Sequence, residues 1–324
     1  MTQLLTISAL QRWISRPGKM ELTHEPVLYN EIIHALRPTS GGRYVDGTVG
    51  AGGHAAGLLL NSEPTGLLLG LDVDPRALDL ARQKLAPFGE RALLKKASYT
   101  SLPEQLASLG WDSVDGILLD LGASSMQFDN PERGFSFLAD GPLDMRFDPA
   151  NPLTAGQIIN SWPERDLADL IYRYGEERDS RRIARAIVRN RPIQGTSELA
   201  AVIQAAVGRH GPHHPATKTF QALRIAVNGE LESIEKVLPL AVQALSPKSR
   251  LAVISFHSLE DRLVKEFFRQ ESRDCICPPG QLVCTCEHKA SIKEIVRRPV
   301  TPGEAEIKEN PRARSAKLRI AEKL

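Results

Sequence analysis

A glycine-rich turn is the segment of this chain whose residue types and spacing best suit chemistry. The turn, Asp46-Gly47-Thr48-Val49-Gly50-Ala51-Gly52-Gly53-His54, follows the apolar pair Tyr44-Val45 and precedes a helix-like stretch. Glycine tolerates positive φ and lets a ligand approach the main chain, and a helix N-terminus offers unpaired N–H donors. We therefore expect a strand, a tight turn and a helix that bind a nucleotide-like molecule.

Acidic residues near this turn favour one kind of ligand. The apolar segment 66–71 ends at Asp72, about twenty residues after the glycines, where such folds place an acid on a ribose hydroxyl. The segment 50–55 also fits the dinucleotide fingerprint, so an oxidoreductase that uses NAD is an alternative. Asp46 would repel a pyrophosphate but suits the ammonium and sulfonium cations of S-adenosylmethionine. We expect S-adenosylmethionine, and a turn that binds no ligand is the simplest alternative.

Strand and helix patterns alternate from Tyr44 onward, which predicts a Rossmann-like α/β fold with a parallel sheet covered on both faces. Helix 74–85 has a capping residue, Asp74, and a proline at its first position. Further strands are predicted at 66–71, 91–96, 116–122 and 250–256, and a further helix at 103–109. Because ligands collect at the carboxyl ends of parallel strands, Asp46, Asp72 and Asp120 should meet at one crevice.

A long insertion separates the strand that ends near Asp120 from the next convincing strand. It begins with a loop rich in Gly, Pro and Asp, 129–152, and continues with helix-like segments at 155–159, 164–174, 181–191 and 197–207. We call residues 129–231 the helical insert, and we assign 23–128 and 232–324 to the sheet domain. Six arginines in 178–191 predict either a phosphate-binding face or a solvated, ion-paired helix surface.

Composition excludes several classes of protein. The 324 residues are 42% hydrophobic, which permits real cores and excludes a disordered chain. The 41 Lys and Arg nearly balance the 39 Asp and Glu, so contacts with nucleic acid require local basic patches. No apolar run approaches the length of a membrane span and no secretory signal is present, so we expect a cytoplasmic protein without membrane partners.

Both ends of the chain carry basic residues. The first 19 residues contain Arg12, Arg16 and Lys19 and no acid, which superficially resembles a transit peptide. We instead expect residues 1–22 to be a poorly ordered N-terminal extension. At the other end, the alternating segment 316–321 predicts a final edge strand whose Lys and Arg discourage pairing with other chains.

Several longer motifs resemble the bacterial 16S rRNA (cytosine-N4)-methyltransferase family, RsmH (MraW), from about His24 to the C-terminus. The segments that carry the resemblance are 46–54, 120–127, 133–137, 141–146, 219–231, 255–262 and 310–319. Their number and order make chance agreement far less plausible than for a single glycine motif.

The resemblance implies a class I S-adenosylmethionine-dependent methyltransferase whose helical insert recognises the substrate. The implied reaction methylates the exocyclic N4 of a decoding-centre (P-site) cytosine in 16S rRNA of the small ribosomal subunit. A noncatalytic rRNA-binding assembly factor stays the alternative from a different class, and a homodimer is left open. The implied cofactor contacts are Gly52, Gly53, His54, Asp72, Tyr99, Asp120 and Gln127.

Chemistry at N4 requires hydrogen-bond acceptors, because the amino lone pair is delocalised into the pyrimidine ring and is a poor nucleophile. Acceptors can hold the N–H groups, align the nitrogen and take up the proton. The usual proline-rich, aromatic acceptor motif is absent here. The candidate catalytic residues are Asp120, Ser124, Ser125, Asp144 and His257. Asp144 as a turn residue and His257 as a structural hydrogen-bond partner are the simpler interpretations of those two.

Four cysteines form two C-x-C pairs, Cys275-Ile276-Cys277 and Cys284-Thr285-Cys286, separated by six residues. Tetrathiolate zinc binding is one interpretation. Common zinc knuckles use C-x-x-C instead, and members of the resembled family can lack these cysteines. We therefore expect reduced or loosely paired thiols and assign no metal ligand.

Overall fold

The computed structural model describes residues 26–208, 214–281 and 283–324. The expected N-terminal extension lies outside these residues. Within them, no helix combines the length and the apolar character needed to cross a membrane.

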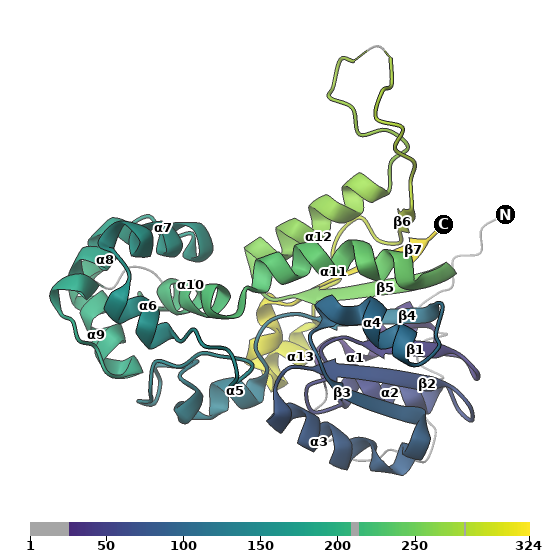
Figure 1. The fold of residues 1–324 in the computed structure, drawn as a ribbon, viewed down its shortest axis with the longest axis horizontal. Helices are drawn as coiled ribbons and strands as arrows, with labels where there is room; N and C mark the ends of the chain where they lie inside the picture. Colours follow the sequence, from purple (N-terminus) through teal and green to yellow (C-terminus); the bar gives the residue numbers. More distant parts are fainter. Residues whose placement is uncertain (1–25, 209–213, 282) are drawn as a thin grey trace.

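A single seven-stranded sheet forms the centre of the molecule (Figure 1). Its strands are β1 (Arg43–Asp46), β2 (Leu67–Asp72), β3 (Ala92–Lys96), β4 (Val114–Asp120), β5 (Leu245–Ser255), β6 (Ile292–Glu294) and β7 (Lys317–Lys323). The spatial order is β3-β2-β1-β4-β5-β7-β6. The first five strands are parallel, β7 is antiparallel to β5, and β6 is antiparallel to β7.

Helices cover both faces of this sheet, as the nearly continuous apolar strands require. One face packs against α1 (Tyr29–Leu36), α2 (Gly53–Asn61) and α3 (Pro75–Leu85), and the other against α4 (Leu102–Ser108), α11 (Glu230–Ala244) and α12 (Ser258–Glu271). The side chains of successive strand residues point to opposite faces of the sheet. In β4, Leu118 joins the core under α1 to α3, and its neighbours Ile117 and Leu119 join the core under α11.

The helical insert has a hydrophobic core of its own and lies to one side of the sheet (left in Figure 1). Its helices are α6 (Ala155–Ser161), α7 (Glu164–Gly175), α8 (Ser180–Arg189), α9 (Thr196–Val207) and α10 (Thr217–Asn228). The core residues of this part run from Phe135 to Val227. Gly229, with φ +57°, ends α10, and α11 then turns back onto the sheet.

Most predicted elements are present with shifts of a few residues at their ends, and one placement was wrong. The side chain of Asp74 caps α3 by accepting a hydrogen bond from the Arg76 amide, as expected. The C-terminal strand β7, however, is not an edge strand, because β6 pairs with its outer side. Arg319 on β7 is buried and donates to Asp261 of α12 at 2.7 Å. Its charge therefore ties the strand to a helix instead of blocking an edge.

Candidate active site

Three acidic residues meet where strands β1, β2 and β4 end. Asp46, Asp72 and Asp120 are the last residues of these neighbouring strands. The chain runs outward from β1 through β2 to β3 on one side and from β4 to β5 on the other, so β1 and β4 form the switch point of the sheet. Open α/β sheets bind ligands in the crevice at this point. The predicted convergence of the three acids is confirmed.

The glycine turn after β1 is tied to both neighbouring strands. The Gly47 amide donates to the Leu118 carbonyl of β4 at 2.9 Å, and the Val49 amide donates to the Leu71 carbonyl of β2 at 2.9 Å. Gly50, with φ +50°, donates its amide to Asp72 Oδ2 at 2.9 Å. The turn is thus held rigidly over the strand ends, and one carboxylate oxygen of Asp72 accepts a hydrogen bond from the turn.

Close packing explains why small residues occupy the turn. A Cβ on Gly53 would lie 2.4 Å from Pro26 Cγ, and a Cβ on Gly47 would lie 2.7 Å from Leu119 Cδ2. Gly52 is the N-cap of α2, with φ +81°. Gly52 and Gly53 therefore lack side chains for structural reasons, and a ligand at this place would meet their main chain at the start of α2.

Burial disfavours the charged forms of all three acids. It raises the pKa of Asp46 to about 7, and the nearby Asp72 carboxylate adds to that shift. Burial also raises the pKa of Asp72, against hydrogen bonds from the Asp74 and Gly50 amides. The pKa of Asp120 rises well above its usual value through burial and repulsion by Asp46 and Glu260. A cationic ligand would lower all three pKa values, so the crevice suits a sulfonium and an ammonium group.

His54 and Asp120 carry buried polar atoms without hydrogen-bond partners. Both ring nitrogens of His54 and Oδ1 of Asp120 are in this condition. His54 Nε2 lies 3.7 Å from Asp120 Oδ2, and its ring stacks on Tyr29 with centroids 6.4 Å apart. Burial and Lys84 lower the pKa of His54 to about 4, so its imidazole is neutral. Unpartnered buried polar groups are costly and are typical of sites that receive a polar ligand.

Thr48 connects two of the acids and was not singled out from the sequence. Its hydroxyl accepts a hydrogen bond from the Asp120 amide at 2.7 Å, and its amide donates to Asp46 Oδ1 at 3.1 Å. The only sequence signal for Thr48 was its position in the glycine turn. That signal is weak, because threonine is found in many turns.

Gln127 lies on the side of the crevice next to α3. It is buried on α5 (Ser125–Asp129), and its amide nitrogen donates to Asp74 Oδ2 at 3.1 Å. Arg133 donates to the same oxygen at 2.7 Å. Asp74, expected only as a helix cap, therefore also joins α3 to the first residues of the helical insert.

Tyr99 lies on the opposite side of the glycine turn. A Cβ on Gly47 would lie 3.1 Å from Tyr99 Cβ, and the Tyr99 ring belongs to the core under α11. Burial and the nearby Glu230 and Glu260 carboxyls raise the pKa of Tyr99, so its hydroxyl stays protonated. The tyrosine thus joins the glycine turn to α11.

The remaining predicted catalytic residues lie in different surroundings. Ser124 precedes α5 and donates its amide to Gln127 Oε1 at 3.0 Å, whereas Ser125 is exposed. Asp144 accepts two hydrogen bonds from the Arg146 guanidinium, at 2.9 and 2.8 Å, and the pairing lowers the pKa of Asp144 although burial opposes it. Among the described residues, no hydrogen bond joins Asp144 to the three acids of the crevice.

His257 belongs to a buried cluster of charged residues beside Asp120. Its Nε2 lies 3.1 Å from Glu260 Oε1. Arg224 of α10 donates twice to Glu230 at 2.8 Å and lies 3.9 Å from Glu260. Burial raises the pKa of Glu260, but His257 and Arg224 outweigh it, and the pKa is lowered.

Gly122 places the loop after β4 directly on this cluster. A Cβ there would lie 3.6 Å from Glu260 Oε1 and 3.9 Å from a guanidinium nitrogen of Arg224. Sequence reasoning missed Arg224, Glu230 and Glu260. No local sequence pattern distinguishes these three residues, because only the packing of α10, α11 and α12 brings them together.

The sheet order, the antiparallel strand β7 and the acidic crevice define a class I S-adenosylmethionine-dependent methyltransferase. The MraW methylase family matches residues 21–324. The chain belongs to this family. Family membership favours methyl transfer over the oxidoreductase alternative, and it makes S-adenosylmethionine the cofactor.

Two relatives that are about 50% identical agree with this assignment. The chain is 50% identical over 312 residues to ribosomal RNA small subunit methyltransferase H of Heliobacterium mobile, covering 94% of this chain and 100% of the relative. It is 51% identical over 306 residues to the protein of the same name from Dehalococcoides mccartyi, covering 94% and 88%. A solved rRNA methylase from Streptococcus thermophilus is 12% identical, with a TM-score of 0.42 and coverage of 96% and 98%.

Proposed function

We propose that this protein methylates the exocyclic N4 amino group of a decoding-centre (P-site) cytosine in 16S rRNA of the small ribosomal subunit. The relatives that are about 50% identical over nearly their whole length are named for small-subunit rRNA methylation. The observation that carries the chemical part is Asp120, a half-buried aspartate at the switch point whose Oδ1 is buried and has no hydrogen-bond partner.

The residues around the crevice fit the cofactor. We assign its contacts to Gly52, Gly53, His54, Asp72 and Gln127, with Tyr99 beside the adenine and Asp120 near the cationic end. Bound S-adenosylmethionine supplies an electrophilic methyl group on a sulfonium. The buried acids stabilise that positive charge, and the start of α2 offers N–H donors to the polar groups of the ligand.

Asp120 is the acceptor that amino-group methylation requires. Its unpartnered oxygen would accept an N–H of the cytosine amino group, which directs the nitrogen lone pair toward the methyl group. As the nitrogen gains a bond to carbon, it loses a proton, and Asp120 takes it up. A carboxyl whose pKa is raised binds that proton more readily than an ordinary aspartate does.

The other candidate residues receive different parts in this proposal. Ser124 lies in the loop next to Asp120 and offers a further polar contact to the base. Asp144 is a positioning residue, because Arg146 pairs with its carboxylate. We also assign His257 to positioning, through its 3.1 Å contact with Glu260. Ser125 is exposed at the start of α5, and we assign it to contact with RNA outside the crevice.

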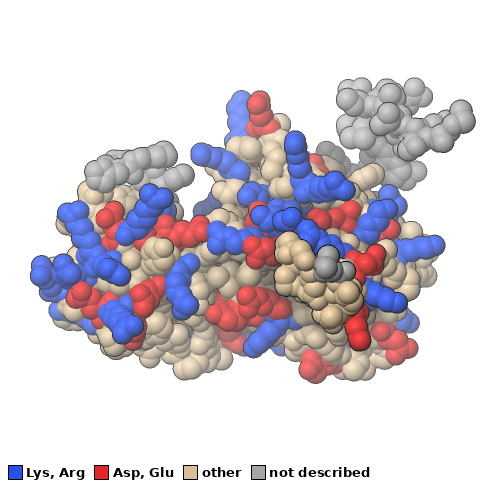
Figure 2. Space-filling view, turned by 90° about the horizontal axis from the view of Figure 1, so that it is seen from above, with Lys and Arg blue, Asp and Glu red and all other residues tan. Residues whose placement is uncertain are grey.

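The helical insert is the proposed RNA-recognition part. Arg181, Arg182 and Arg189 are exposed on α8. Figure 2 shows Lys and Arg at the end of the molecule that holds this insert, mixed with acidic residues. Arg191 is different, because it donates to the Ile159 and Trp162 carbonyl oxygens and so holds α6 to the end of α8. We place this activity in the cytoplasm, on the ribosomal small subunit.

Mapping of cytosine methylation tests the proposal. Small-subunit rRNA from cells with and without this gene should differ at one decoding-centre cytosine, and the purified protein should restore that N4 mark on subunits from the deletion strain. Free 16S rRNA and assembled subunits, offered side by side, identify the form of the substrate. An unchanged rRNA map would contradict the proposed substrate, and bound cofactor without any methyl transfer would favour a noncatalytic assembly factor.

A further inference from the structure

The loop between α12 and β6 projects from the body of the molecule (top of Figure 1), and none of its described residues is buried. It contains all four cysteines of the chain. Its larger apolar side chains are exposed, Ile276 by 41% and Val283 by 71%. A loop of this length whose described residues include no helix, strand or buried apolar side chain requires another source of order.

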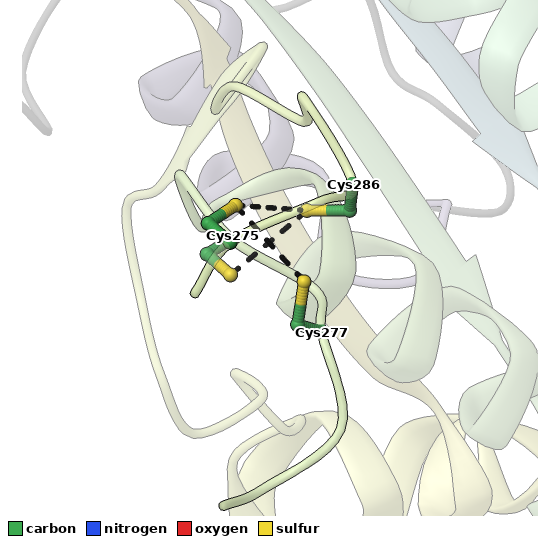
Figure 3. Close-up of side chains that lie close together, drawn as sticks. Cys275, Cys277 and Cys286 are labelled. Atoms are coloured by element: carbon green, nitrogen blue, oxygen red, sulfur yellow. Dashed lines mark hydrogen bonds between the residues drawn. The ribbon is translucent and has the colours of Figure 1, made fainter. Parts of the chain in front are cut away.

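The four cysteine sulfurs converge at the middle of this loop (Figure 3). All four Sγ atoms lie within 4.8 Å of one another. The separations are 3.6 Å between Cys284 and Cys286, 3.9 Å between Cys275 and Cys286, and 4.0 Å between Cys277 and Cys284. A disulfide requires about 2.05 Å between sulfurs, so none of these pairs is bonded.

These separations fit a single shared cation. Four sulfurs placed about 2.3 Å from a central zinc ion form a tetrahedron whose edges are about 3.8 Å long. Three of the six sulfur–sulfur separations, 3.6, 3.9 and 4.0 Å, bracket that edge, and all six are within 4.8 Å. Our sequence-based preference for reduced or loosely paired thiols rested on the C-x-C spacing and on family members that lack these cysteines. The distances between the sulfurs argue against it.

The surroundings of the sulfurs suit thiolates. The Ile276 amide donates to Cys286 Sγ at 3.4 Å, and the Thr285 amide donates to Cys277 Sγ at 3.5 Å. Such N–H donors stabilise thiolate ligands and orient them. His288, the nearest histidine in sequence, is engaged elsewhere, with Nδ1 2.8 Å from the Arg273 carbonyl and Nε2 3.3 Å from Glu271. The ligand set is therefore four sulfurs.

We propose that Cys275, Cys277, Cys284 and Cys286 bind one zinc ion as a closed tetrathiolate that holds the projecting loop in shape. Four thiols and Zn²⁺ yield a Zn(Cys)₄ unit of charge −2 and release four protons, with no change in oxidation state. Soft thiolate ligands in a tetrahedral arrangement favour zinc, and a site with four protein ligands is structural.

A second group of metal-ligand residues does not compete with this site. Glu230, His257 and Glu260 also lie close enough together to share an ion. Arg224 already places a buried positive charge against both carboxyls, at 2.8 Å from Glu230 and 3.9 Å from Glu260. A metal ion there would have to displace that guanidinium.

Metal analysis of the full-length protein tests the proposal. Protein purified without chelator should contain one zinc per chain by mass spectrometry, and a Cys275→Ser/Cys286→Ser variant should contain almost none. Thr285→Ser is the matched control in the same loop and should keep the metal. Zinc added to reduced, metal-free protein should bind with a Kd below about 1 μM.

Two further readouts keep the test decisive. Cobalt(II) added to the metal-free protein should produce the visible bands of a tetrahedral tetrathiolate, and the double variant should not. Reduced protein that takes up neither zinc nor cobalt, or that yields two disulfides on thiol counting, would overturn the proposal. Iron recovered in place of zinc would overturn the choice of metal. None of these outcomes depends on methyl transfer, so the test is independent of the proposed function.

Discussion

His54 Nε2 lies 3.7 Å from Asp120 Oδ2, which places a buried imidazole against a half-buried carboxyl. Burial and Lys84 lower the pKa of His54 to about 4, and burial and neighbouring acids raise the pKa of Asp120 well above its usual value. Both groups therefore favour their neutral forms in the ligand-free crevice. The arrangement is prepared for a ligand that brings its own positive charge.

Asp120→Asn should reduce methyl transfer at saturating cofactor by about 100-fold or more, because the amide cannot take up the proton. The fold should be retained, since the Asp120 amide still donates to Thr48. Single-turnover transfer to small subunits measures the effect. Asp112→Asn, an exposed acid before the same strand, is the control. Turnover close to that of the control in the Asp120 variant would remove Asp120 from the mechanism.

Asp46→Asn should change how stability depends on pH. The pKa of Asp46 is about 7 in the folded protein, against 3.8 for an ordinary aspartate, so the folded state binds more protons than the unfolded state between these values. The ligand-free protein therefore loses stability as pH rises toward 7, and the variant escapes this loss. The free energy of unfolding of the variant, relative to that of the unmodified protein, should be about 2 to 3 kcal/mol larger at pH 8 than at pH 5.

Urea unfolding of both proteins at the two pH values measures that gain. Asp112→Asn is again the control, and its stability should follow the unmodified protein at both pH values. A stability difference between Asp46→Asn and the unmodified protein that is the same at pH 5 and pH 8 would show that Asp46 is charged in the crevice.

Arg224→Met should destabilise the protein by about 3 to 5 kcal/mol, because it leaves Glu230 buried without its cation. Adding Glu230→Gln should restore part of the loss, since the remaining group is neutral. Urea unfolding measures both variants, with Arg76→Met, an exposed arginine on α3, as the control. Equal destabilisation in the single and double variants would mean that packing, and not charge, dominates at this site.

The exposed arginines of α8 should contribute to RNA affinity through phosphate contacts. Arg181, Arg185 and Arg189 are four residues apart and share one face of the helix. Replacing all three with Gln should weaken binding to small-subunit rRNA and reduce its salt dependence by about one ion per arginine. Arg82→Gln on α3, also exposed, is the control for the loss of a surface arginine outside the insert. A salt dependence unchanged by the triple variant would assign these arginines to a solvated surface.

Local patterns were sufficient to predict the elements and the first part of the site. Apolar runs that end in Asp46, Asp72 and Asp120 predicted three parallel strands whose ends meet, and the structure brings them together. The position of β7 could not be predicted in the same way. The alternating residue pattern of a strand is the same whether the strand lies at the edge of a sheet or next to the edge strand. The strand β6, which pairs with the outer side of β7, has three residues, too few for a recognisable sequence pattern.

What the sequence alone determined is the part that depends on neighbours along the chain: the glycine turn, the cap at Asp74, the acid at each strand end and the long helical insert. Tertiary structure decided which side chains share an environment. Arg224, Glu230 and Glu260 come from three helices, and their charges matter because packing buries both carboxylates and leaves Arg224 only 12% exposed. The cysteines show the same division, since spacing left zinc and free thiols open and only the folded loop sets the distances between sulfurs.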